Sequence, residues 1–193
     1  MSYNVLVIPE DFTKDEHILK PLVKQVLADA GRPNAIVEIC RNPNFQGIPE
    51  CLKVGRLREE VVHRYPMVNL FLLLVDADGN PGRRKSLDHI VAELQNDLKA
   101  GSQFLAEMAL QEVEIFPVAG HDLSAGWKWQ EIRADGSVKN TYFKALAERE
   151  KTEGLPHQDR KKLMGAAMKN WNRIRTRCPE ETVQLTERIK KLL

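Results

Sequence analysis

In the segment NLFLLLVDAD, residues 69–78, six apolar residues in a row lead into two aspartates. A continuous apolar run of this kind is typical of a strand that is covered on both faces of a parallel sheet. Asp76 and Asp78 stand where that strand would end. Two carboxylates at such a place repel each other unless a positive charge lies between them. The stretch therefore predicts a buried strand with a binding site at its end.

Three other segments of the chain have the pattern of short buried strands. They are rich in β-branched residues and are bounded by proline, glycine or asparagine. These segments are NVLVIPED at residues 4–11, AIVEICRN at 35–42 and EVEIFPVA at 112–119. We expect the last of them to be the fourth strand of a sheet, with Val113, Ile115 and Val118 alternating along it.

Segments with apolar residues at helical spacing separate the expected strands. Thr13 and Glu16 match a capping box for the first helix, which contains Pro21 and ends at Gly31. We expect two further helices between strands, at 52–65 and 86–99. A loop or hairpin is expected at 120–136, and the rest of the chain is expected to be helical, at 139–151, 159–175 and 179–193.

The alternation of strands and helices predicts an α/β protein with an open, mainly parallel four-stranded sheet and helices on both faces. We expect an α/β domain over residues 1–136 and a helical C-terminal extension over residues 137–193 that packs on it. Residues 139–193 carry fourteen Lys and Arg against seven Asp and Glu, a net +7, so the rest of the chain carries −5. This asymmetry favours a cation site beside a surface that meets anions, although a solvated helical face is the alternative.

The composition predicts a soluble globular protein of the cytoplasm. The chain has 193 residues, of which 42% are hydrophobic and 29% are charged. Its first residues lack the pattern of a secretory signal, and no apolar run approaches the roughly 18 residues of a membrane span. Three cysteines without CxxC spacing predict neither a zinc site nor a disulfide framework. The chain has no P-loop and no dinucleotide-binding motif, which speaks against both classes of enzyme.

Acids stand at the ends of two expected strands. Glu10 and Asp11 close the first strand, and Asp76 and Asp78 close the third. Ligands of open parallel sheets bind at the carboxyl ends of strands, so we expect these acids to converge. On an extended backbone, Asp76 and Asp78 would point to the same side with their Cα atoms roughly 6–7 Å apart. Such carboxylates favour Mg²⁺ or Mn²⁺; the alternative is that Asp-Ala-Asp-Gly is an ordinary turn.

Three consecutive cations follow the acidic end of the third strand. Arg83, Arg84 and Lys85 precede the expected start of a helix at Ser86. Helix starts bind phosphate through free amides, and arginine binds it through a bidentate fork. We therefore expect these three side chains to bind phosphate.

Residues after the expected fourth strand supply further candidate contacts. Tryptophans can stack on unpaired bases, and lysines can follow a phosphate backbone. The alternatives are that the tryptophan packs on the body of the protein and that the lysines are simply solvated. The candidates for contact with nucleic acid are His121, Trp127, Lys139, Lys161 and Lys162.

A strand ending in Glu, then an amphipathic helix, then a hydrophobic strand ending in Asp-x-Asp resembles the Toprim domain. That domain occurs in topoisomerases, primases and overcoming-lysogenization-defect type nucleases. VLVIPEDFTKDEHILKPLV, residues 5–23, looks like the Glu-bearing strand and helix of the family, and LFLLLVDADGN, residues 70–80, looks like its Asp-x-Asp strand. The resemblance covers roughly residues 4–119, and Asp11 stands where the family has glycine.

The resemblance implies a nuclease that cleaves phosphodiester bonds of DNA or RNA with Mg²⁺ or Mn²⁺. Glu10, Asp76 and Asp78 would be the catalytic, metal-binding residues, and Asp11 would add a ligand. Small stand-alone relatives, often encoded beside an ATPase in defence loci, imply an antiphage effector with a partner ATPase. One alternative is a non-catalytic Toprim-like subunit, which Asp11 favours. Another is a receiver-like or Rossmann-like domain for a small phosphorylated ligand, although no suitable lysine ends the expected fourth strand.

Overall fold

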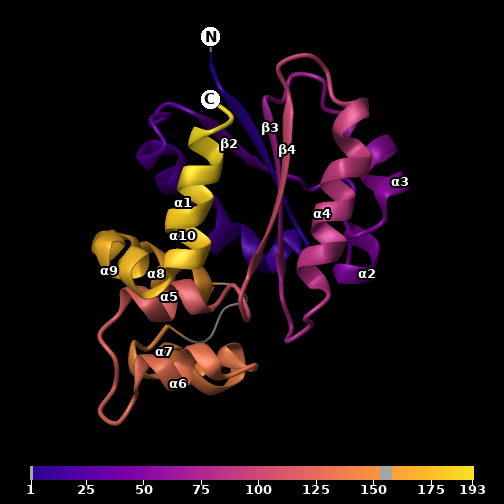
Figure 1. The fold of residues 1–193 in the computed structure, drawn as a ribbon. Coiled ribbons are helices and arrows are strands. Elements are labelled where there is room, and N and C mark those ends of the chain that lie inside the picture. The colour runs from indigo at the N-terminus through magenta and orange to yellow at the C-terminus, as the bar shows by residue number, and fades with distance from the viewer. Residues whose placement is uncertain (1, 153–157) are drawn as a thin grey trace.

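The computed structural model describes residues 2–152 and 158–193, and it has an α/β architecture (Figure 1). Its one sheet has the strand order β2-β1-β3-β4 and only parallel pairings. The strands are β1 (Asn4–Pro9), β2 (Ile36–Ile39), β3 (Leu70–Asp76) and β4 (Gln103–Ala109). The predicted class, an α/β protein with a parallel four-stranded sheet, is therefore confirmed.

Helices cover both faces of the sheet (Figure 1). The long helix α1 (Phe12–Asp29), with Pro21 inside it, packs on one face, and α4 (Arg83–Leu94) packs on the other. A short 3-10 turn, η2 (Gln95–Asp97), continues α4. The face that carries α4 is completed by the connection from β2 to β3, which contains α2 (Ile48–Cys51), α3 (Val54–Arg56) and a π-helical segment, η1 (Leu57–Val62).

The chain after β4 is helical. The helix α5 (Ile115–Gly120) lies beside the end of the sheet, and α6 (Trp129–Ala134) and α7 (Lys144–Arg149) lie below it in the view of Figure 1. The last helix runs back along α1 on the same face of the sheet. The remaining elements are η3 (Lys139–Phe143), α8 (Gln158–Ala167), η4 (Met168–Asn170), α9 (Trp171–Arg177) and α10 (Pro179–Lys190).

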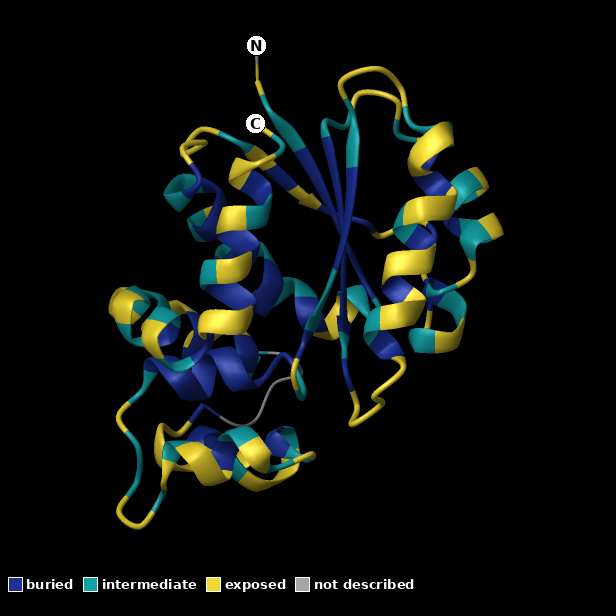
Figure 2. Ribbon diagram, in the orientation of Figure 1, coloured by how far each residue is buried: buried dark blue, intermediate teal, exposed yellow. Residues whose placement is uncertain are grey.

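The strand quoted at the outset is the centre of the molecule. All residues of β3 before Asp76 are buried, and in Figure 2 the middle of the sheet is dark blue along its length. Leu72 and Leu74 join the cluster under α1, while Phe71 and Leu73 join the cluster under α4. This alternation explains why the sequence of the strand is apolar throughout, since each side chain has a covered face to enter.

The C-terminal helices share the core of the sheet. Leu185 and Ile189 of α10 belong to the same buried cluster as Val5 and Leu72 of the strands. Helices α5 and α8 also cross very closely, because a Cβ atom added at Gly120 would lie 2.4 Å from the Cβ atom of Ala167. The helices α8 and α10 are therefore bound into the hydrophobic core that holds α1 to the sheet.

The expected position of the fourth strand was wrong. The segment 112–119 contains the helix α5, and the fourth strand is Gln103–Ala109, which pairs with β3 from Leu70 to Asp76. Every residue of α5 is buried, so the apolar alternation that suggested a strand belongs to a short helix enclosed on all sides. The sequence QFLAEMA of the real strand is rich in good helix formers, and its place beside β3 outweighs that preference.

Several expected helix boundaries also differ from the structure. The first helix is capped by Asp11, whose Oδ1 accepts the backbone N–H of Thr13 at 3.0 Å, so the capping box at Thr13 is not used. The helix expected from Ser86 begins at Arg83. The helix expected over 52–65 is divided among α2, α3 and η1, and the segment 120–136 contains α6 in place of a hairpin. Among the described residues, no helix has the length and apolarity that crossing a bilayer requires.

Candidate functional site

The carboxyl ends of β1 and β3 meet at the point where the order of the strands reverses. From β1 the chain moves outward to β2, and from β3 it moves outward to β4 on the other side. Crevices at such switch points are where open parallel sheets bind ligands. Glu10 follows β1 directly, and Asp76 is the last residue of the neighbouring β3. The sheet therefore brings together two of the acids that the sequence singled out.

Glu10 and Asp76 lie close enough for the charge of each to act on the other carboxyl group. Burial, followed by the charge of Asp78, raises the pKa of Glu10 well above its ordinary value. Burial, followed by the charge of Glu10, raises the pKa of Asp76 as well. The Oδ1 of Asp76 also accepts the backbone N–H of Val113 at 3.0 Å, which fixes its orientation. Two carboxyl groups this close share a proton at neutral pH unless a cation replaces it.

Asp78 lies beside this pair in a turn. The strand ends at Asp76, and Asp78 has a φ of 49°, so the extended backbone expected through Asp78 was wrong. The turn is closed by a hydrogen bond from the N–H of Asn80 to the carbonyl of Ala77 at 2.9 Å. Asp78 is exposed, yet its charge is the second-largest cause of the raised pKa of Glu10. It therefore contributes negative charge to the mouth of the site.

Two buried acids that the sequence analysis missed extend the cluster inward. Asp15 of α1 is 8% exposed, and Glu114 is 3% exposed just before α5. Burial, then the charges of Glu114 and Glu10, raises the pKa of Asp15 to about 7. Glu114 forms a buried ion pair with Arg160 of α8, which is 6% exposed and lies over the ring of Phe143. Since 46 residues separate the partners of that ion pair, no local pattern announced it.

Asp11 is occupied as a helix cap. Its carboxylate accepts hydrogen bonds from the backbone and the hydroxyl of Thr13, and its Oδ2 lies 2.6 Å from the Nζ of Lys14. Burial raises the pKa of Asp11, but the hydrogen bonds from Lys14 and Thr13 outweigh that effect and bring it to about 2. The role that the structure gives this side chain is to start α1.

The three consecutive cations point in different directions because they lie on the first turn of α4. Arg83 is 8% exposed, its charge acts on Glu10, and its Nε has no hydrogen-bond partner among the described residues. Arg84 instead donates to Glu107 and to the carbonyl of Ala106 on β4, and Lys85 is exposed. Of the three, the structure brings only Arg83 to the acids.

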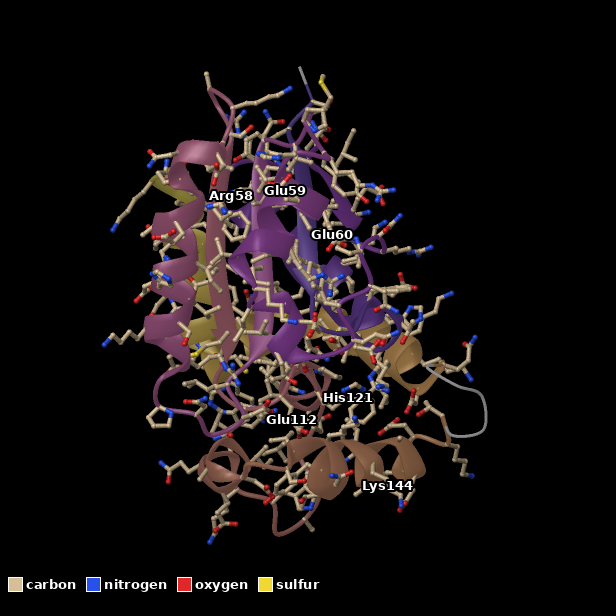
Figure 3. The ribbon with its side chains drawn as sticks, turned by 90° about the vertical axis from the view of Figure 1, so that its right-hand side faces the viewer. Arg58, Glu59, Glu60, Glu112, His121 and Lys144 are labelled. Atoms are coloured by element: carbon tan, nitrogen blue, oxygen red, sulfur yellow. The ribbon has the colours of Figure 1, made fainter. Side chains whose placement is uncertain are left out.

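His121 and Trp127 make contacts of their own, apart from the pair of Glu10 and Asp76. His121 follows α5, where its Nδ1 lies 2.7 Å from the carbonyl oxygen of Pro117, so its expected place after a strand was wrong. Trp127 packs edge-on against Tyr142, with ring centroids 5.0 Å apart. In Figure 3, His121 and Glu112 lie between the end of the sheet and the helix that carries Lys144.

The predicted basic contacts are on the surface of the C-terminal helices. Lys161 and Lys162 are exposed on α8, and within the described part of the chain they form no ion pair. Lys139 is half-buried at the start of η3, and its backbone N–H donates to Glu112 at 2.7 Å. These lysines are therefore available to a partner, but they are not part of the acid cluster.

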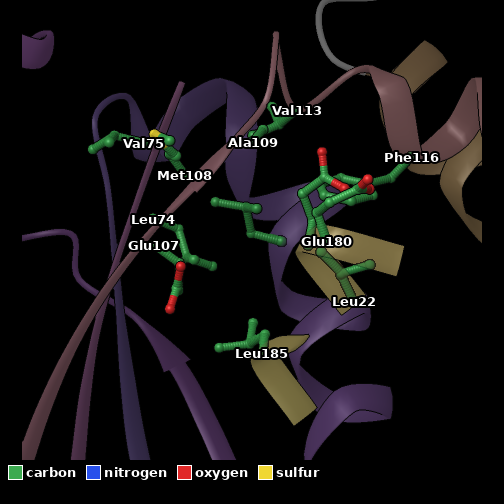
Figure 4. A pocket seen from close by; sticks show the side chains of 12 residues that line it. Leu22, Leu74, Val75, Glu107, Met108, Ala109, Val113, Phe116, Glu180 and Leu185 are labelled. Carbon is green, nitrogen blue, oxygen red and sulfur yellow. The ribbon is translucent and has the colours of Figure 1, made fainter. Parts of the chain in front are cut away.

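Two hollows lie near this edge of the sheet. The first is enclosed between the strands β3 and β4 and the helices α1 and α10, and Figure 4 shows its mainly apolar lining. Its volume is about 20 Å³, which is room for little more than a water molecule. The second is a pocket of about 440 Å³ beside Glu10, and all its lining side chains are polar. Only the second can receive a ligand of ordinary size.

No group of three or more His, Cys, Asp and Glu side chains within residues 2–152 and 158–193 is arranged to hold a metal ion. Comparison of the chain with protein-family models, with curated proteins and with solved structures finds no match. The geometry of this edge of the sheet is therefore the basis for inferring a function.

Proposed function

We propose that the protein is a nuclease that cleaves phosphodiester bonds of nucleic acid with Mg²⁺ or Mn²⁺. The observation that carries the proposal is the pair of interacting carboxyl groups, Glu10 and Asp76, at the switch point of the sheet. The fold gives neither carboxylate an arginine or lysine partner among the described residues, although both are largely removed from water. Acids kept in that state are typical of functional sites.

The donor set fits a hard divalent cation. Mg²⁺ takes one or two carboxylates from the protein and fills its remaining positions with water and substrate phosphates, so two adjacent carboxyl groups suffice. Glu10 and Asp76 would hold the ion, and Asp78 would approach through its turn. A bound ion would lower the charge of the phosphate and the pKa of an attacking water. Oxygen ligands of this kind favour Mg²⁺ or Mn²⁺ over zinc.

Arg83 supports a role with phosphate. A buried guanidinium whose Nε has no partner carries an unpaid desolvation cost, which an anionic ligand would offset. It enters the site from the first turn of α4, beside the acids. In the proposed reaction it donates to a non-bridging phosphate oxygen as negative charge develops there.

The carboxyl pair supports the proton transfers of hydrolysis. Water adds to phosphorus, the bond from phosphorus to the leaving oxygen breaks, and one proton leaves the water. Glu10 takes that proton as a general base and returns it to the leaving oxygen, which becomes the hydroxyl group of the second product. The carboxylate of Asp76 is held in position beside Glu10 by the hydrogen bond that it accepts from the backbone N–H of Val113. The products are a phosphomonoester and a hydroxyl group.

The resemblance to Toprim nucleases adds the finer parts of the proposal. In this view the sheet and α1 to α4 are a Toprim-like core, residues 137–193 are its helical extension, and the exposed Lys161 and Lys162 meet nucleic acid or a partner ATPase. The strand order and the acids at the ends of β1 and β3 are compatible with that view. An effector of antiphage defence is the cellular role that follows from it.

The proposal is tested with the purified full-length chain on single-stranded DNA, duplex DNA, RNA and tRNA in Mg²⁺ or Mn²⁺. Cleavage is expected to require the metal and to fall at least about 100-fold in Glu10→Gln and Asp76→Asn, since each removes a charge that the metal needs. Glu93→Gln, an exposed acid of α4, is the matched control. Cleavage that survives both site variants would show that a contaminant or another site is responsible.

A non-catalytic interaction module is the second candidate, and one observation favours it. Asp11 stands where Toprim nucleases have glycine, and it is committed to capping α1. Titration calorimetry with Mg²⁺ and Mn²⁺ separates the two candidates. The nuclease proposal expects binding that Asp76→Asn abolishes, and a module with a vestigial site expects no binding in either protein.

A further inference from the structure

The polar pocket beside Glu10 is formed by two segments from different strands. One is the turn from β1 into α1, and the other is the loop from β2 into α2. A hydrogen bond from the N–H of Gly47 to the backbone carbonyl of Glu10, at 3.0 Å, ties the loop to the strand. The pocket measures about 440 Å³ and is lined by Glu10, Asp11, Thr13, Lys14, Asn44 and Gln46.

The loop presents two amide side chains to this pocket. Phe45 is 2% exposed and anchors the loop in the core, while its neighbours Asn44 and Gln46 are exposed. Gln46 and Gly47 both have positive φ, at 50° and 110°, so the chain turns sharply around the pocket. Neither amide side chain makes a hydrogen bond to the described residues, whereas Asn42 on the same loop has Arg64 within reach. Two free amides therefore face one hollow.

The charges of the lining select the kind of ligand. Asp11 is neutralised by Lys14 and by the hydrogen bonds of Thr13, which leaves Glu10 as the group open to a new partner. A phosphate in the pocket would lie against two carboxylates, and an apolar ligand would leave the amides unpaired. The lining suits a neutral, flat, polar group that has both donors and acceptors on its edge.

We infer that this pocket receives one unpaired nucleobase of the substrate, so that the protein acts on single-stranded nucleic acid. Asn and Gln amides match the edges of bases, and those edges are free only in unpaired nucleotides. Glu10 lines the pocket and belongs to the acid pair, so a base bound here sets its own phosphodiester beside that pair. The inference rests on the proposed nuclease function and adds the strandedness of its substrate.

The test measures binding without cleavage. Fluorescently labelled 12-nucleotide DNA and RNA strands, and duplexes of the same sequence, are titrated with the full-length protein in Ca²⁺ in place of Mg²⁺. We expect single strands to bind at least tenfold more tightly than duplexes, and Asn44→Ala/Gln46→Ala to weaken single-strand binding about tenfold. The DNA and RNA arms show which sugar the substrate carries.

The matched control is Gln95→Ala/Asn96→Ala, which removes the same two amides from exposed positions on and beside the end of α4. It is expected to bind both strands as the unchanged protein does. Equal affinity for single strands and duplexes, or single-strand binding that Asn44→Ala/Gln46→Ala leaves intact, overturns the inference. Cleavage assays in Mg²⁺ distinguish the two proposals. Metal-dependent cleavage that Asn44→Ala/Gln46→Ala does not change would support the nuclease and rule out the base pocket. Single-strand binding that depends on the two amides, without any cleavage, would rule out the nuclease and leave the pocket supported.

Discussion

The acids that are largely removed from water fall into two contrasting sets. One set is paired with arginines of the helices after β4, and the other set, around the switch point, has no arginine partner among the described residues. The paired acids are Glu107 with Arg84 and Arg188, Glu114 with Arg160, and Glu181 with Arg133. The unpaired acids are Glu10, Asp15 and Asp76. The unpaired set is left to bind protons or an outside cation, and this contrast is the reason for proposing a functional role for Glu10 and Asp76.

The largest effect is expected from breaking the best-buried pair. Arg160→Met leaves Glu114 as a buried charge without its partner, so the free energy of unfolding is expected to fall by about 3–5 kcal/mol. Urea unfolding followed by circular dichroism measures the loss. The control is Lys128→Met, which breaks an exposed pair with Glu131 and is expected to cost less than about 0.5 kcal/mol. A loss below about 1 kcal/mol for Arg160→Met would mean that the pair is not needed.

A double variant sharpens the same contrast. Adding Glu114→Gln to Arg160→Met removes the stranded charge, so part of the lost stability is expected to return. If the double variant is no more stable than Arg160→Met, the loss comes from packing around Arg160, such as its contact with Phe143, and not from charge.

The unpaired set predicts the reverse response, since removing one of its charges is expected to stabilise the fold. Burial and the neighbouring carboxylates raise the pKa of Asp15 to about 7, so the folded protein keeps a proton that the unfolded chain releases near pH 4. Asp15 therefore costs no stability below about pH 4, and its cost grows between about pH 4 and pH 7 and is constant above pH 7. Asp15→Asn is expected to match the unchanged protein at pH 4.5 and to exceed it by about 2 kcal/mol at pH 8.

Thermal unfolding from pH 4.5 to pH 8 checks this prediction, with Glu93→Gln as the exposed control. The gap in Tm between Asp15→Asn and the unchanged protein must widen with pH. A constant gap would show that the variant acts through packing and that Asp15 keeps an ordinary charge in the fold.

Binding of a divalent cation would reduce the repulsion between the unpaired carboxylates without removing either of them. If Glu10 and Asp76 hold Mg²⁺, a concentration of about ten times Kd stabilises the folded state by about 1.4 kcal/mol. The Tm at pH 8 is expected to rise with Mg²⁺ in the unchanged protein and to stay constant in Asp76→Asn. KCl at equal ionic strength is the control for screening. An equal rise in both proteins would place the cation elsewhere on the surface.

The contrast between the two sets also explains what the sequence reveals. Glu10 and Asp76 each end a run of apolar residues, so a strand pattern and the topology of parallel sheets were enough to bring them together. The pairs depend on contacts between distant segments, such as Glu114 and Arg160, and no local pattern encodes such contacts. The same limit explains the misplaced fourth strand, since QFLAEMA becomes a strand only because β3 offers it an edge.

The structure at the starts of the helices could not be predicted from the sequence either. Nothing in the sequence distinguishes the three consecutive cations Arg83, Arg84 and Lys85. On the first turn of α4, Arg83 faces the acids, Arg84 faces β4 and Lys85 faces solvent. The position of Asp11 directly after Glu10 predicts a metal ligand, whereas in the structure its carboxylate caps α1, a role that aspartate favours. The sequence thus predicted which edge of the sheet to study better than which side chains act there.

The smallest effect is expected where a buried acid has two arginines. Glu107 is held by Arg84 and Arg188, so Arg188→Met leaves it one partner and is expected to cost about 0.5–1 kcal/mol in urea unfolding. Arg84→Met/Arg188→Met is expected to cost more than the sum of its parts, because Glu107 then stands unpaired as Glu10 does. Burial raises the pKa of Glu107 even with both arginines present, so the stability of the double variant should fall more steeply with rising pH than that of either single variant. Strict additivity would mean that partners are not what separates the two sets of acids.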